Sequence, residues 1–84
     1  MARQPAKEFV REVLLTLTEE PRMHYGVVRW VVDGRAGQPV IEKREMYETE
    51  EGTPKSGKLR GINKADWDLL KENQAKVEEI FAKG

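Results

Sequence analysis

Residues 23–47 read MHYGVVRWVVDGRAGQPVIEKREMY, and this stretch carries the signals that decide the fold. The run 23–32 is rich in aromatic and β-branched residues, a composition typical of a β-strand. Asp33-Gly34 then favours a tight turn. Residues 40–47 supply a second strand-like run, which we expect to pair with the first as an antiparallel hairpin.

In the second of these strands, apolar and polar residues alternate only weakly. Ile41 and Tyr47 fall on the same face as Lys43 and Glu45. A half-polar strand of this kind is not buried on both sides, so we expect it at a sheet edge or under a hydrated binding surface. In the first strand, Trp30 shares a face with other apolar residues and is either a core residue or a stacking group.

The segments on either side extend the pattern. Residues 8–18 fit a helix and a strand equally well, because both periodicities occur in them. Residues 52–57 have the composition of a flexible loop, and residues 58–62 form a short fourth strand. The expected order is therefore a series of short β elements with a helix at the end.

The C-terminal segment is predicted to be one amphipathic helix. Asn63 is a good N-cap, and Asp66 at the N3 position completes a capping box. Trp67 begins an apolar stripe and is expected to pack back on the sheet. The predicted fold is a single α+β domain over 1–84, with a flexible tail (1–7), a four-stranded antiparallel sheet (8–62) and one helix (63–82).

Composition narrows the function classes. A chain of 84 residues is near the lower size limit for a self-sufficient core, so a second copy is a natural source of further burial. There is no cysteine and one histidine, and no catalytic motif is present, so we expect neither an enzyme nor a metal or cofactor site. No apolar run suggests a membrane span or a signal peptide, which favours a cytoplasmic protein.

The charges are segregated although they sum to zero, with 15 basic and 15 acidic residues. Residues 53–64 carry only basic charges, and residues 45–51 carry only acidic ones. Residues 21–44 hold a surplus of three basic residues, five against two. One interpretation is evenly solvated surface charge; the other is a local positive face beside acidic surfaces.

Cations and an aromatic side chain gather along residues 41–60. Arginine and lysine bind phosphates, and an aromatic face stacks on any base, so this ribbon has what a single-stranded nucleic acid requires. RNA and DNA are not distinguished by such contacts. A protein-interaction module that docks an acidic or helical partner is the alternative, motivated by the acidic run 45–51 and the uneven strand before it.

Four motifs together resemble the transcriptional positive cofactor 4 family of single-stranded-DNA-binding coactivators. They are Arg29-Trp30-Val31-Val32, then residues 40–47, then Glu51-Gly52-x-x-Lys55-x-Gly57-Lys58, and finally Asn63-Lys64-Ala65-Asp66-Trp67. The resemblance covers about residues 27–82, and the segment 9–18 is similar to the N-terminal strand of prokaryotic and phage members. Lys43 departs from the pattern, because the family has an apolar residue there.

The resemblance implies a four-stranded antiparallel sheet, a C-terminal helix and a homodimer joined partly through the helices. It makes residues 9–18 a strand. It implies binding of single-stranded or unwound DNA in transcription, replication, recombination or repair, alongside proteins of those processes. The residues that it and the charge pattern assign to nucleic acid are Arg29, Arg35, Arg44, Tyr47, Lys55, Lys58 and Arg60.

Overall fold

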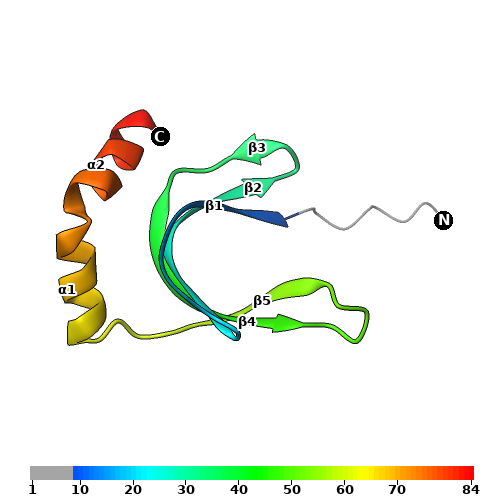
Figure 1. The fold of residues 1–84 in the computed structure, drawn as a ribbon. Helices are drawn as coiled ribbons and strands as arrows, with labels where there is room; N and C mark the ends of the chain where they lie inside the picture. The colour runs from blue at the N-terminus through cyan, green and yellow to red at the C-terminus, as the bar shows by residue number, and fades with distance from the viewer. Residues whose placement is uncertain (1–8) are drawn as a thin grey trace.

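The computed structural model describes residues 9–84, apart from the side chain of Pro54, and contains an antiparallel sheet followed by two helices (Figure 1). The strands are β1 (Phe9–Glu20), β2 (Met23–Val32), β3 (Arg35–Ala36), β4 (Val40–Glu48) and β5 (Pro54–Leu59). The helices are α1 (Lys64–Glu72) and α2 (Gln74–Lys83). The α+β class predicted from the sequence is confirmed. The predicted tail at residues 1–7 lies outside the described residues.

The sheet has the order β1-β2-β4-β5, and the two-residue β3 pairs with β2 off this path. β2 is the central strand, because it pairs with β1 along its whole length and with β4 along its first six residues. The tight turn predicted after β2 is present: Asp33 and Gly34 have φ values of 50° and 81°. β1 is a strand, as the family resemblance implied.

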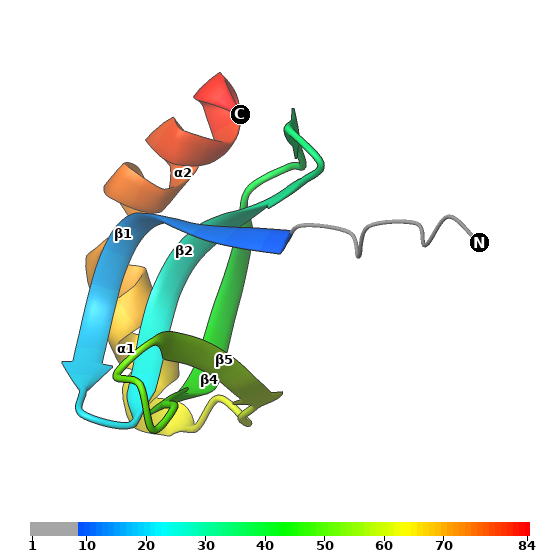
Figure 2. The same ribbon diagram turned by 90° about the vertical axis from the view of Figure 1, so that its right-hand side faces the viewer.

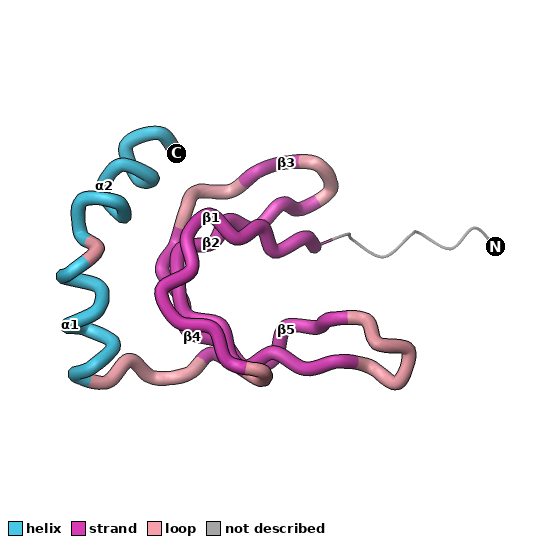
Figure 3. Tube along the Cα trace, in the orientation of Figure 1, coloured by secondary structure: helices cyan, strands magenta, loops and turns pink. Residues whose placement is uncertain are grey.

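The sheet is strongly curved, and the helices cover its outer side (Figures 1 and 3). Two register shifts in β1, between Val13 and Leu15 and between Thr16 and Thr18, contribute to the bend. Gly26 permits the close approach there, because a Cβ on this residue would lie 2.0 Å from the Leu15 carbonyl oxygen. The inner side is left concave and faces away from the helices (Figure 2).

The core between the sheet and the helices is small. Tyr25 and Val27 are completely buried, and Val77 of α2 is 5% exposed. The Tyr25 hydroxyl donates a hydrogen bond of 2.8 Å to the carbonyl oxygen of Asp66, which joins β2 to the first turn of α1. A core of this size leaves large apolar side chains exposed on the outer surface.

Polar contacts fix the start of α1. The predicted capping box is present. The Asn63 side-chain oxygen Oδ1 accepts from the backbone N–H of Asp66 at 2.9 Å, and Asp66 Oδ2 accepts from the backbone N–H of Asn63 at 3.1 Å. Lys43 of β4 donates to the same carboxylate at 2.7 Å. The Lys43 hydrogen bond is the main cause that holds the pKa of Asp66 below its ordinary value, against the effect of burial. Lys43, the departure from the family pattern, therefore ties the sheet to the helix.

Three details of the sequence prediction are wrong. The fourth strand lies at Pro54–Leu59 rather than at 58–62, because Lys55 and Ser56 pair with the end of β4. The single helix expected over 63–82 is interrupted at Asn73, whose side chain donates to the Leu69 carbonyl oxygen at 2.9 Å. Trp67 is 54% exposed instead of buried against the sheet, since Asp66 is the residue that turns inward.

Within residues 9–84, neither helix has the length and apolar composition needed to cross a membrane.

Candidate nucleic-acid interface

Five side chains gather on the concave face of the sheet. Arg44 pairs with His24 across β4 and β2, and Arg11 pairs with Trp30 across β1 and β2. Paired residues share a face, and alternation along β4 puts Glu42 on the same side as Arg44. This face is opposite to the one that carries Tyr25 and Lys43 under the helices. We call Arg11, His24, Trp30, Glu42 and Arg44 the concave cluster.

Glu42 is the centre of the concave cluster. Its carboxylate accepts from Arg11 Nε at 2.5 Å and from Arg44 Nε at 3.0 Å, both at Oε1. Oε2 accepts from Arg44 Nη2 and from Trp30 Nε1, each at 3.3 Å. Burial raises the pKa of Glu42, but hydrogen bonds from Arg44, Arg11 and Trp30 outweigh it and bring the pKa below its ordinary value. Two guanidinium groups and one carboxylate leave the cluster with one surplus positive charge.

His24 is held in one neutral tautomer. Arginine has only N–H donors, so the 2.9 Å contact from Arg11 Nη2 makes His24 Nδ1 an acceptor. His24 Nε2 therefore carries the proton and donates to Thr16 Oγ1 at 3.0 Å. Burial, and then the Arg11 charge, lower the pKa of His24 from its ordinary 6.5, against opposing effects of Glu19 and Glu42.

Arg44 is oriented by its neighbours and retains binding capacity. Besides Glu42, it donates from Nη1 to the Gly57 carbonyl oxygen at 2.7 Å. Each terminal guanidinium nitrogen carries two N–H groups and uses one of them in these contacts, so each keeps one that no other described residue accepts. The guanidinium carbon lies 5.4 Å from the centroid of the Trp30 ring, within cation–π range.

Tyr47 and Lys55 form a second group, on the hairpin arm made by residues 46–59. They are directly paired across β4 and β5, and Tyr47 is 53% exposed. Alternation along β4 places Tyr47 on the opposite face of the strand from Arg44. The structure therefore does not bring Tyr47 and Arg44 together on one surface, although they are three residues apart.

Of the remaining candidates, Arg60 lines the same hollow as Tyr47, and the others are dispersed. Arg29 lies on the helix side of β2 and pairs with Glu12 at 2.6 Å, with its Nε buried and lacking a partner among the described residues. Arg35 is exposed on β3, at the other end of the sheet. Arg60 follows β5 and forms an exposed ion pair of 2.6 Å with Glu45. Lys58 is exposed on β5 beside Arg44's partner Gly57.

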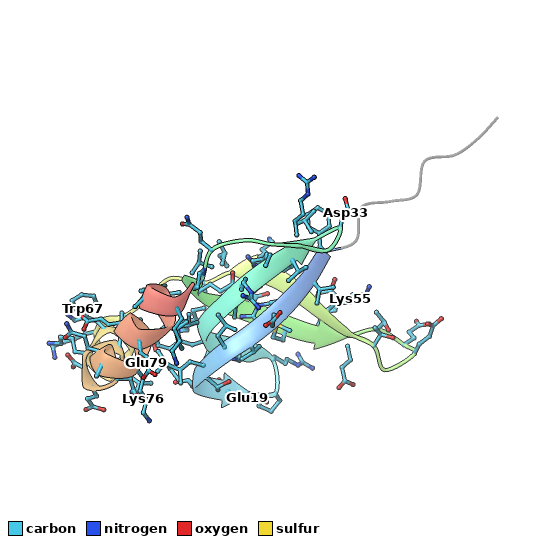
Figure 4. The ribbon with its side chains drawn as sticks, turned by 90° about the horizontal axis from the view of Figure 1, so that it is seen from above. Glu19, Asp33, Lys55, Trp67, Lys76 and Glu79 are labelled. Atoms are coloured by element: carbon cyan, nitrogen blue, oxygen red, sulfur yellow. The ribbon has the colours of Figure 1, made fainter. Side chains whose placement is uncertain are left out.

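Acidic side chains reduce the positive charge of the hairpin arm. A hollow of about 400 Å³ at its tip is lined by Lys55 together with Glu50 and Glu51. Lys55 lies on the sheet side of the molecule, and Trp67 lies beyond the helices at the other end of the view (Figure 4). The positive charge of the arm is therefore local and is confined to Lys55 and Lys58.

Sequence reasoning missed Arg11 and Glu42 as parts of the site. Their contact joins residues 31 positions apart and depends on β1 and β4 lying on either side of β2. The one signal available was a charged residue inside each strand-like run, because a charge that becomes buried in a sheet requires a partner.

Comparisons with family models, with curated proteins and with solved structures gave no match for this chain.

Proposed function

We propose that this protein binds single-stranded or unwound DNA without strong sequence preference, as a member of the positive cofactor 4-like family. The observation that carries the proposal is the direct pairing of Tyr47 with Lys55 on the hairpin arm. An exposed aromatic ring next to a cation supplies base stacking and phosphate contact at one place. The sequence motifs around these two residues support the same function.

Arg44 contributes a second phosphate contact. It is fixed by Glu42 and by the Gly57 carbonyl oxygen, and it retains one N–H group on each terminal nitrogen. A guanidinium oriented before binding loses little side-chain entropy when it contacts a phosphate. Lys58 adds a charge on the neighbouring strand, whereas the ion-paired Arg29 and Arg60 are weaker contributors.

Fluorescence anisotropy with a labelled oligo-dT tests the proposal, with matched duplex DNA and oligo-U probes in parallel. Binding to oligo-dT is expected at low salt and should weaken steeply as salt is added. Lys55→Ala should weaken binding, and Lys76→Ala on the outer helix α2 is the charge-matched control. The absence of oligo-dT binding at low salt would contradict the proposal; a preference for oligo-U would make RNA the ligand.

The proposed functional form is a homodimer joined through the helices. An apolar groove of about 500 Å³ runs along them, and its lining includes Ile41, Trp67, Leu70, Val77 and Phe81. Trp67 and Phe81 are 54% and 42% exposed and line the same groove, so they form a contiguous apolar patch of the kind that marks an interaction site. A second copy would cover this surface and add the burial that the chain lacks.

Size-exclusion chromatography with light scattering tests the dimer. Phe81→Glu should shift the mass toward the monomer, and Lys76→Glu on the same helix should leave it unchanged. A monomeric parent protein would contradict the dimer. A dimer that binds none of the probes would instead favour the protein-interaction module.

A further inference from the structure

The aromatic residue that shares a face with Arg44 is Trp30 rather than Tyr47. Trp30 is on the concave face of β2, where it pairs with Arg11. It is half-buried, so part of its side chain remains accessible. The fully buried Tyr25 and Val27 belong to the other face, so Trp30 is not part of the core under the helices.

Glu42 holds Trp30 and Arg44 in a fixed relation. One carboxylate oxygen, Oε2, accepts from the indole Nε1 and from Arg44 Nη2, each at 3.3 Å. The other oxygen accepts from Arg11, which also contacts His24. Because the indole N–H is satisfied by Glu42, the ring needs no further polar partner, and the ring face that Arg44 does not cover is what it can offer a ligand.

The Arg44 guanidinium lies over one face of the Trp30 ring, so the opposite face is the one that a base can stack on. The Arg44 guanidinium carbon is 5.4 Å from the Trp30 ring centroid. Arg44 keeps one N–H group on each terminal nitrogen, which suits a phosphate oxygen pair. In a single strand of nucleic acid, each base presents an apolar face and lies close to a phosphate anion. Trp30 and Arg44 offer the two complementary groups, a ring and a cation, close to each other.

We propose that Trp30 and Arg44 form a nucleotide subsite on the concave face, in which Trp30 stacks a base, Arg44 binds the adjacent phosphate, and Glu42 is the positioning residue for both. This inference rests on the proposed function and adds a second subsite to the one on the hairpin arm. The strand would thus contact both faces of β4, the concave face at Arg44 and the opposite face at Tyr47.

Intrinsic fluorescence tests the subsite directly, because the chain has two tryptophans. Trp67→Phe leaves Trp30 as the only reporter, and Trp30→Phe leaves Trp67, which lies beyond the helices. Oligo-dT should quench the emission of the Trp67→Phe protein and leave the Trp30→Phe protein nearly unchanged. Because Trp67 lines the proposed dimer groove, both proteins are titrated at one protein concentration at which light scattering shows the same oligomeric state for each.

The result separates the two proposals. If labelled oligo-dT binds the Trp67→Phe protein by anisotropy but Trp30 emission stays constant, the subsite is wrong and the proposed function stands. If no oligo-dT binds to the parent protein, both fail together. Trp30→Leu, which removes the stacking ring, should weaken binding by about tenfold, the range expected for one stacked base.

Glu42→Gln tests the positioning role against simple electrostatics. The substitution removes one negative charge, which by charge alone would strengthen DNA binding. If Glu42 positions Trp30 and Arg44, binding should instead weaken severalfold and the quenching of Trp30 should shrink, in protein shown to be folded by circular dichroism. Stronger binding with full quenching would overturn the positioning role.

Discussion

The concave cluster and the hairpin arm carry similar residue types in opposite physical settings. Glu42 is 7% exposed and accepts hydrogen bonds from three side chains, whereas Tyr47 is 53% exposed. Cations of the cluster are paired within the protein; Lys55 and Lys58 on the arm are exposed to solvent. Contacts in the cluster are therefore fixed before any ligand arrives, and those on the arm are adaptable.

This difference separates stability from binding. When one partner of a buried ion pair is removed, the other charge stays buried without a counter-charge. Substitutions in the concave cluster should therefore lower the free energy of unfolding more than they change ligand binding. Exposed side chains contribute little to folding, so changes on the arm should affect ligand binding alone.

Removal of Arg11 should give the largest effect. The side chains of Arg11 and Glu42 are 7% and 6% exposed, so Arg11→Ala leaves a buried carboxylate with one guanidinium partner instead of two. We expect a loss of about 3 kcal/mol in the free energy of unfolding, measured by urea denaturation. Arg29→Ala is the control, because the Arg29–Glu12 pair is 31% and 43% exposed, and it should cost below about 1 kcal/mol. Equal losses in the free energy of unfolding for the two variants would show that burial does not make the Arg11–Glu42 pair more important for stability than the Arg29–Glu12 pair.

Tyr47→Ala should affect binding and spare stability. The free energy of unfolding should change by less than about 0.5 kcal/mol, because the ring is exposed. The affinity for oligo-dT should fall by about 1–3 kcal/mol, the contribution of one stacked base. Anisotropy and urea denaturation on the same preparation measure both quantities. A loss of stability with unchanged affinity for oligo-dT would show that Tyr47 stabilises the fold and does not contact the ligand.

The sequence predicted those parts of the fold that depend on neighbouring residues. The Asp33-Gly34 turn, β2 and the Asn63–Asp66 capping box follow from local backbone chemistry and are all present. The position of β5 was not predictable in this way. Its Lys55 and Ser56 read as loop residues, and only their pairing with β4 makes them a strand.

The candidate site was predictable to a lesser extent. Charge segregation identified Arg44 and Lys55 as cations of interest but did not indicate that they lie on different faces. The partners of Arg44 depend on the register of β4 against β2 and β5, which is a property of the assembled sheet. The Arg11–Glu42 contact spans 31 positions and has no local signature.

The concave cluster should also make stability depend on pH through His24. Its pKa in the folded protein is below the ordinary 6.5, chiefly because of burial. Between these two values the unfolded chain binds a proton that the folded chain does not, so stability decreases as pH falls. The contribution of His24 is complete above about pH 6.5 and is lost as pH falls from 6.5 toward the folded-state pKa.

Thermal unfolding from pH 8 to 5 measures this dependence. His24 is the only histidine of the chain, so His24→Gln should flatten the curve near pH 6. Glu42 and Asp66 also have lowered pKa values, but their ordinary values are 4.5 and 3.8, so their contributions are lost only at lower pH. A slope near pH 6 that persists in His24→Gln would contradict this assignment.

The smallest expected effect is on the salt dependence of binding by the arm. If Lys55 contacts one phosphate, Lys55→Ala should reduce the slope of log K against log salt concentration by at most about 0.7, the value for a single strand. Glu50 and Glu51 line the same hollow as Lys55, and their charges should keep the change below this limit. Anisotropy titrations at four or more salt concentrations would resolve it. An unchanged slope would show that Lys55 makes no phosphate contact and that the arm binds through Tyr47 alone, which would leave Arg44 in the rigid cluster as the main phosphate-binding group.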